Sequence, residues 1–211
     1  MGSETIGPPL ERPSRGKRLL WFSMLAAVWL SVVFSGLWVV WAYENRPGTE
    51  ANPPQAWPPH SSLVPASDRP TLVFLAHPQC TCTRASIGEL AEVLARTPNH
   101  PKTYVLFLRP SVVDADWEKT GLWRSAMALP DVTVLRDHDG VEARRFGVET
   151  PGQTLLYDAG GRLIFSGGIT GSRGHAGDNA GEAALVALLT SGQADRRATS
   201  VFGCPLFATG N

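Results

Sequence analysis

Apolar and polar positions after residue 70 fall into two kinds of pattern, which predict alternating strands and helices. The runs TLVFLA (71–76) and TYVLFL (103–108) are short, continuous and apolar, which is typical of strands buried on both faces. Between them, apolar side chains recur at helical spacing: Ile87, Leu90, Ala91 and Leu94. Residues 83–96 are therefore predicted to form an amphipathic helix. Together the three segments predict a right-handed βαβ unit with parallel strands.

The same reading continues to residue 190 and completes an α/β domain. It predicts, in chain order, a helix over 116–127, a strand over 132–137, a DHDG turn followed by a short helix, a hairpin formed by 153–158 and 162–167, and a last helix over 179–190. Asn179 is a suitable N-cap for that last helix, since Glu182 follows three residues later. We therefore predict a mixed sheet flanked by helices.

An uncharged apolar segment, residues 19–43, precedes the domain. Its length allows it to cross a bilayer core of about 30 Å with some tilt. Basic residues come directly before it: Arg12, Arg15, Lys17 and Arg18. The positive-inside rule then places residues 1–18 in the cytoplasm and the rest of the chain outside, as a single-pass inner-membrane protein. A cleaved signal peptide is the rival interpretation, but its apolar core is usually only about 7–15 residues long.

Residues 44–69 are rich in proline and lack apolar periodicity, so they are predicted to be an extended linker between membrane and domain. Such a spacer reaches at most roughly 80 Å at about 3.1 Å per residue. Trp57 and His60 are expected to be solvated within it. The domain itself is predicted over 70–192, and residues 193–211 form a C-terminal tail.

Charge gives no indication of a nucleic-acid partner. The 211 residues include 19 basic and 19 acidic side chains, which cancel, and no basic stripe interleaved with aromatic residues is present. Four of the seven tryptophans fall in the apolar segment 19–43, which suits a membrane span better than an aromatic binding face.

Two cysteines, Cys80 and Cys82, lie where the first strand ends and the first helix begins. Ligands of open α/β sheets bind at this edge. A helix N-terminus exposes unpaired N–H groups and a partial positive charge, which favour a thiolate. Three uses of the pair compete: a structural disulfide, a metal site, or a redox pair that opens and closes. A disulfide across one residue closes too small a loop to stabilise the fold much, and its strain would make it easy to reduce.

The stretch LVFLAHPQCTCTRAS, with Pro78 before the cysteines, resembles the strand, proline and cysteine motif of the thioredoxin superfamily. The later run from Val132 to Gly168 is similar to the second half of membrane-anchored, extracytoplasmic proteins of the TlpA and ResA kind, and the chain also resembles the RedB group. The resemblance covers about residues 70–192. It implies a thioredoxin-like fold and a thiol–disulfide oxidoreductase.

Two departures from that family concern the site. The family motif is CxxC, whereas only Thr81 separates the two cysteines of this chain. The family also places a cis-proline opposite the cysteines; here Gly152 takes that position and Pro151 comes one residue early. The resemblance therefore implies that Pro151 helps to dock the substrate only if a local shift of the backbone brings it to the position of Gly152.

These observations favour a redox pair that needs no cofactor and acts on protein thiols and disulfides outside the cytoplasm. Cys80 is predicted to attack and Cys82 to resolve the mixed disulfide. The glycine-rich loop 167–181 should return to the same edge, bringing Arg173 and His175 near the thiols, while His77 lies just before them. The alternative is a copper-binding assembly module, with Cu(I) held by Cys80, Cys82 and His175.

A third cysteine, Cys204, lies in the tail segment TSVFGCPLFATGN. If the tail folds back, Cys204 is a possible resolving thiol. The other interpretation, which its apolar neighbours favour, is a buried small residue beside Val201, Phe202 and Leu206.

Overall fold

The computed structural model describes residues 15–207 and divides the chain into two compact units, residues 1–43 and 44–211. The first unit contains α1 (Arg15–Glu44), a 30-residue helix whose most apolar 18-residue stretch has a mean hydropathy of 2.0. It is long and apolar enough to cross a membrane, although a signal sequence near an N-terminus has the same character. Most of the predicted cytoplasmic segment 1–18, like the last four residues of the tail, lies outside the described residues.

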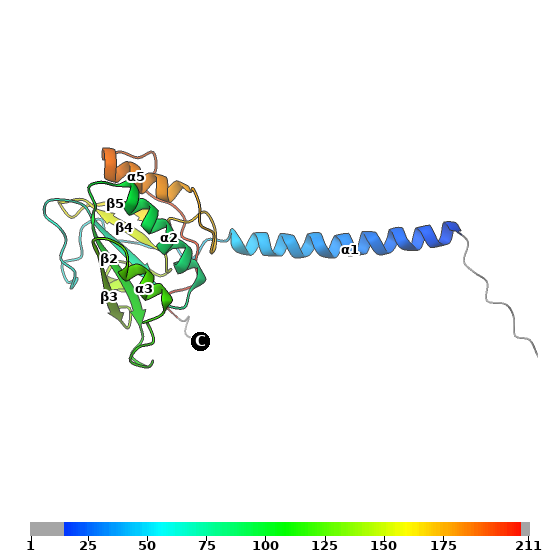
Figure 1. The fold of residues 1–211 in the computed structure, drawn as a ribbon, viewed down its shortest axis with the longest axis horizontal. Helices are drawn as coiled ribbons and strands as arrows, with labels where there is room; N and C mark the ends of the chain where they lie inside the picture. Colours follow the sequence, from blue (N-terminus) through cyan, green and yellow to red (C-terminus); the bar gives the residue numbers. More distant parts are fainter. Residues whose placement is uncertain (1–14, 208–211) are drawn as a thin grey trace, which may run out of the picture. The chain divides into compact units, whose positions relative to one another are not determined.

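A five-stranded mixed sheet organises the second unit (Figure 1). Its strands are β1 (Thr71–Ala76), β2 (Lys102–Arg109), β3 (Val132–His138), β4 (Thr154–Tyr157) and β5 (Leu163–Gly167), in the spatial order β3-β2-β1-β4-β5. The first three strands run parallel, and β4 is antiparallel to both β1 and β5. The predicted parallel βαβ unit and the predicted hairpin are both confirmed.

Four helices complete the second unit: α2 (Thr81–Arg96), α3 (Gly121–Met127), α4 (Val141–Arg145) and α5 (Ala180–Ser191). Asn179 caps α5 as predicted, because its side-chain oxygen accepts hydrogen bonds from the backbone N–H groups of Gly181 and Glu182. The prediction that α3 begins at residue 116 is wrong. The segment before it forms turns, since Glu118 points into the protein to pair with arginines of the sheet.

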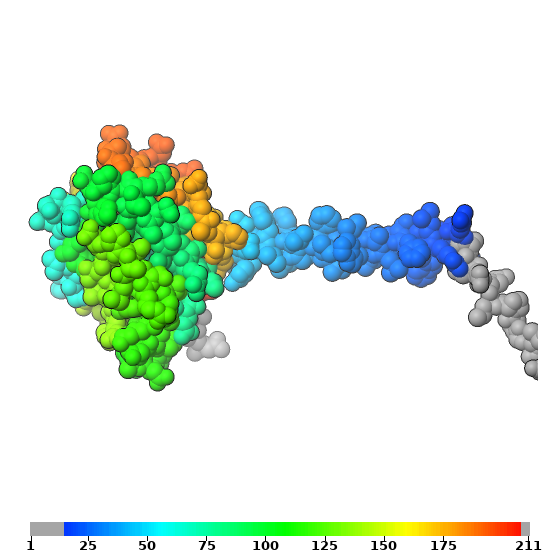
Figure 2. Space-filling model, in the orientation of Figure 1, coloured from blue at the N-terminus to red at the C-terminus, as the bar shows by residue number. Residues whose placement is uncertain are grey.

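One face of the sheet packs against α2, α3 and α5 (Figure 1). Leu72, Phe74 and Phe107 project from the strands into this core and are fully buried. They meet the apolar stripe of α2, whose members include Leu90 and Val93. On the side of the unit seen in Figure 2, the side chains of α2 and α3 form one continuous surface over the sheet.

The opposite face is covered by α4 together with parts of the linker and the tail. Its core contains Val73 and Leu75 of β1, Phe146 after α4, Leu63 of the linker and Leu206 of the tail. Leu63 is 5% exposed and Leu206 is 3% exposed, so each buries its side chain as completely as a core residue. Segments that look like solvated appendages in the sequence therefore close this side of the domain.

The interpretation of residues 44–69 as an extended spacer is wrong for residues 47–63, which we call the strap. The Trp57 ring packs edge-on against Phe146 and Tyr157, at centroid distances of 5.2 and 5.1 Å. The Tyr157 hydroxyl donates to the carbonyl of Pro54 at 3.1 Å. Further hydrogen bonds fix the strap to the domain, among them Gly48 N to Val201 O, Asn52 N to Gly147 O, and Trp57 N to Gly161 O. Trp57 is thus a structural residue of the domain.

The buried Glu142 carboxylate holds the end of the strap. It accepts hydrogen bonds from the hydroxyl of Ser61 at 2.6 Å and from the backbone N–H and hydroxyl of Ser62, both at 3.0 Å. These hydrogen bonds hold the pKa of Glu142 below its ordinary value, although burial acts in the opposite direction. The strap is therefore fastened at both ends.

Candidate functional site

The cysteine pair lies at the start of α2, as the sequence predicts. Cys80 is the N-cap residue, with extended backbone (φ −95°, ψ 126°), and its carbonyl accepts from the N–H of Arg84 at 3.3 Å. Cys82 lies in the first helical turn and is 5% exposed, whereas Cys80 is half-buried. The more accessible thiol therefore sits at the positive end of the helix, with the second thiol beneath it.

The ionisation of Cys82 depends on burial and on the charges around it. Burial raises the pKa of Cys82 above its ordinary value, and negative charge on Cys80 and a hydrogen bond with the Cys80 side chain raise it further. The Arg173 guanidinium acts in the opposite direction. A thiolate on Cys80 therefore disfavours a second thiolate on Cys82, so Cys82 is held as a thiol beside its neighbour.

His77 and Pro78 shape the loop that leads into the pair. The N–H of Gln79 donates to His77 Nδ1 at 3.3 Å, and the ring packs edge-on against Trp117 at 5.4 Å. Burial lowers the pKa of His77, which keeps the imidazole neutral. The N–H of Cys80 donates to the carbonyl of His77 at 3.2 Å. These contacts assign His77 to the geometry of the loop.

A segment from another part of the chain, residues 114–120, supports this loop, and we call it the brace. The hydroxyl of Thr120 donates to the carbonyl of Pro78 at 2.9 Å. Glu118 anchors the brace: its side chain is fully buried, bonds to Arg136 Nε, and forms an ion pair with Arg109 Nε at 3.4 Å. The brace could not be recognised from the sequence, because the acidic residues of 114–118 all look solvated, whereas Glu118 is buried.

Pro151 and Gly152 lie on the other side of the pair. Every peptide bond in residues 15–207 is trans, including the one before Pro151. The N–H of Gly152 donates to the carbonyl of Leu75 at 2.7 Å, which prolongs the β1–β4 pairing toward the cysteine loop. Gly152 has φ +92°, and a Cβ atom there would lie 3.1 Å from Ser86 Oγ. Only glycine adopts this conformation readily, so Gly152 is the residue that lies against Ser86 of α2.

Ser86 connects Gly152 to the pair, and it was not among the residues predicted for the site. Its buried hydroxyl donates to the carbonyl of Cys82 at 3.1 Å. The available signal was its spacing, since Ser86 follows Cys82 by four residues and therefore shares the buried face of α2.

The glycine-rich loop brings Arg173 to the site. Arg173 Nε donates to the carbonyl of Arg46 at 3.1 Å, and its Nη1 lies 3.7 Å from the sulfur of Cys204. His175 is exposed, and its Nδ1 lies 2.9 Å from the carbonyl of Arg173. The positive charge of Arg173 lowers the pKa of Cys82, against the effect of burial. Of the two predicted loop residues, the structure places Arg173 beside the thiols and turns His175 toward its own backbone.

Cys204 is exposed, so the favoured interpretation of a buried small residue is wrong. Its neighbours Val201 and Leu206 are buried instead. The Cys204 thiol lies beside Arg173 and close enough to Cys82 for its charge to raise the pKa of Cys82. All three cysteines of the chain thus gather at one edge of the sheet.

The copper alternative finds no prearranged site in the part of the chain that is described. Within residues 15–207, no three His, Cys, Asp or Glu side chains are placed to hold a metal ion. The cation beside Cys204 is the Arg173 guanidinium. These residues do not fit a ready copper site, and copper binding remains a prediction from sequence.

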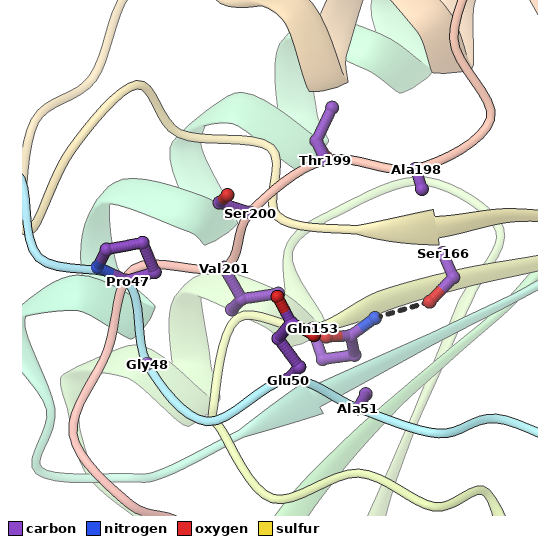
Figure 3. Close-up of a pocket in the computed structure, with 10 residues that line it drawn as sticks. All are labelled: Pro47, Gly48, Glu50, Ala51, Gln153, Ser166, Ala198, Thr199, Ser200 and Val201. Atoms are coloured by element: carbon purple, nitrogen blue, oxygen red, sulfur yellow. Dashed lines mark hydrogen bonds between the residues drawn. The ribbon is translucent and has the colours of Figure 1, made fainter.

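A polar cleft of about 350 Å³ opens where strap, hairpin and tail cross (Figure 3). Pro47 and Glu50 line it from the strap, Ser166 from β5 and Val201 from the tail. The Gln153 amide donates to the Ser166 hydroxyl at 2.9 Å within this cleft. The tail therefore forms part of the surface of the domain next to Gly152.

Comparison with known proteins gives structural matches only: no family model and no curated protein matches the chain. A hypothetical protein from Sinorhizobium meliloti shares 18% identity with a TM-score of 0.54, covering 77% of this chain and all of its own. An uncharacterized conserved protein from Geobacillus kaustophilus shares 16% identity with a TM-score of 0.53, over 79% and 95% of the two chains. A secreted Mycobacterium tuberculosis disulfide oxidoreductase, homologous to E. coli DsbE, shares 22% identity with a TM-score of 0.35, over 46% and 67%.

The second unit has a thioredoxin-like α/β fold, as predicted. A βαβ unit, a further parallel strand, and a hairpin followed by a helix build a mixed five-stranded sheet flanked by helices. The cysteine pair lies at the first strand–helix junction of this sheet.

Proposed function

We propose that the chain is a membrane-tethered, extracytoplasmic thiol–disulfide oxidoreductase of the TlpA and ResA kind, with one residue instead of two between its cysteines. The observation that carries this proposal is the arrangement of the pair, in which half-buried Cys80 takes the N-cap position of α2 and buried Cys82 lies in the first helical turn. The apolar helix α1 supports the tether.

The chemistry is a two-step thiol–disulfide exchange. The Cys80 thiolate attacks one sulfur of a substrate disulfide; a new S–S bond forms, and the other substrate sulfur leaves as a thiolate. Cys82 then gives up its proton and attacks the Cys80 sulfur, which releases the second substrate thiolate and closes the Cys80–Cys82 disulfide. The substrate gains two electrons and the pair loses them. The reverse sequence oxidises a substrate dithiol by the same steps.

Each residue has a defined part in this exchange. Cys80 is the accessible nucleophile, because it lies at the N-terminus of α2. Cys82 stays protonated until Cys80 is consumed, because a thiolate on Cys80 opposes its ionisation. The brace and His77 hold the loop, while Gly152 and Ser86 fix the backbone of Cys82 from the other side.

Alkylation across a glutathione redox series tests the proposal on the full chain in detergent micelles, carrying Cys204→Ser so that only the Cys80–Cys82 pair can form a disulfide. Cys80 and Cys82 should change together between a doubly alkylated and an unalkylated form. If the pair stays in one state throughout the series, the proposal is wrong.

Trapping separates the roles of the two thiols. In a chain that also carries Cys204→Ser, the Cys82→Ser variant should accumulate a mixed disulfide with a disulfide-bonded model peptide. The matched Cys80→Ser variant should accumulate none. Equal trapping by both variants would refute the assignment of Cys80 as the nucleophile.

A further inference from the structure

The tail is fixed on both sides of Cys204. A Cβ atom on Gly203 would lie 2.8 Å from the carbonyl oxygen of Pro151, so the backbone there presses directly on the segment beside the pair. On the other side, the N–H of Leu206 donates to the carbonyl of Glu149 at 2.6 Å, and the Leu206 side chain is buried. Cys204 is therefore held over residues 149–151 by contacts at both flanks.

The surface under the tail is continuous with the first turn of α2. Pro151 leads to Gly152, whose Cα hydrogens face Ser86, and the Ser86 hydroxyl bonds to the carbonyl of Cys82. Val201 lies against Gly152 from the tail side, with its Cγ1 3.9 Å from the position of a Cβ there. The tail thus runs past the same backbone that positions Cys82.

Arg173 is shared by the tail thiol and the pair. Its guanidinium contacts the sulfur of Cys204 at 3.7 Å and is also one of the charges that act on Cys82. A guanidinium in this place stabilises whichever of the sulfurs carries negative charge during an exchange. Arg173 therefore lies where negative charge would pass between Cys204 and the pair during an exchange.

A Cys80–Cys82 disulfide would be a good electrophile for such a thiolate. Its sulfurs belong to an N-cap residue and to the first turn of the same helix, separated by a single residue. Such a short link departs from relaxed disulfide geometry and is readily opened. The Cys80 sulfur is also the better leaving group, since it departs at the helix N-terminus.

We propose that Cys204 is a third redox thiol, which takes over the disulfide from the cysteine pair; this inference rests on the proposed function. Cys204 releases its proton to solvent, and its thiolate attacks the Cys82 sulfur. The Cys80–Cys82 bond breaks, Cys80 leaves as a thiolate, and a Cys82–Cys204 bond forms. No electrons are gained or lost in this step. It returns Cys80 to its nucleophilic state while the chain remains oxidised.

Disulfide mapping of the full chain in detergent micelles tests this transfer. Cleavage by trypsin and Glu-C after Glu50, Arg84 and Arg197 leaves both pair cysteines in peptide 51–84 and Cys204 in peptide 198–211. In the oxidised protein, acid-quenched and alkylated, the two peptides should be linked through Cys82 and Cys204, with Cys80 alkylated. If only an internal disulfide in 51–84 forms at every potential, the transfer is wrong and the proposed function stands. If no disulfide forms, the proposed function itself is wrong.

A glycine variant that keeps the Cys204 thiol tests whether the cross-link depends on the position of the tail. Gly203→Ala should lift the tail, since the new methyl group meets the Pro151 carbonyl, and the cross-linked peptide should be lost while the internal disulfide of 51–84 remains. Gly88→Ala is the matched control, because a Cβ there meets nothing within 4 Å, and it should retain the cross-link. If the cross-link forms in Gly203→Ala at the wild-type amount, the packing of the tail on Pro151 is not what brings Cys204 to Cys82.

Discussion

Replacing Glu118 by glutamine should loosen the brace that supports the cysteine loop. The Glu118 side chain is fully buried, bonded to Arg136 and ion-paired with Arg109. Two residues later, the Thr120 hydroxyl holds the carbonyl of Pro78. Glutamine keeps the shape but removes the charge, so two guanidinium groups would face a neutral amide.

The expected loss follows from the burial of the three side chains. Breaking a buried ion pair by removing one partner costs about 3–5 kcal/mol. Arg109 and Arg136 keep 17% and 37% of their side-chain surface exposed, so water relieves part of this loss, and we expect about 3 kcal/mol. For a unit of this size, that corresponds to a fall in Tm of about 6–12 °C.

Asp116→Asn is the matched control. Its side chain is 69% exposed and pairs with Lys119 at 2.7 Å in contact with solvent, so its loss should lower the Tm far less than the loss of the Glu118 charge. Thermal unfolding of the full chain in micelles, followed by far-UV circular dichroism, measures the Tm of both variants. In chains that also carry Cys82→Ser and Cys204→Ser, Glu118→Gln should additionally speed alkylation of Cys80. A fall in Tm no larger than that of Asp116→Asn would refute the role of Glu118 as the anchor of the brace.

Two further predictions concern the strap and α2. Trp57→Ala should destabilise the domain by about 2–3 kcal/mol in urea unfolding, because it removes two edge-on aromatic contacts. The control His60→Ala removes an exposed side chain of the strap and should change stability by less than about 0.5 kcal/mol. Equal effects of the two variants would contradict the packing of the strap. Burial raises the pKa of Glu89 above its ordinary value of 4.5, so the folded state binds this proton more tightly than the unfolded chain. The Tm of the wild type relative to Glu89→Gln should therefore rise as the pH falls from 7 toward 4.5, and a constant difference would refute the assignment.

The sheet could be predicted from the sequence because its strands are buried on both faces. Every residue of β1 is buried, and such a run of apolar residues has few alternatives. The start of α3 could not be predicted, since it depends on whether Glu118 points to water or to Arg109 and Arg136, which come from two different strands. The strap could not be predicted either. Its apolar anchors, Trp57 and Leu63, are too few to form a period, and only the completed sheet offers them a surface.

The candidate site, too, could be predicted from the sequence only in part. Cys80 and Cys82 could be placed because they lie next to a recognisable strand and helix. The loop residue Arg173 was expected near them from topology, but the sequence does not say that its guanidinium faces Cys204. That contact depends on the path of the tail, which Gly203 and Leu206 determine by packing against residues distant in the chain.

The strap also decides where the domain can be cut away from its apolar helix without harm. Exposed segments with small or polar residues are preferred sites of proteolytic cleavage. In this chain, a cut before Pro47 would free a domain that keeps the ring of Trp57 and the side chain of Leu63 in place. A cut between Trp57 and Leu63 would instead free a domain that lacks part of its own covering. The site of cleavage would therefore determine whether the shed product stays folded.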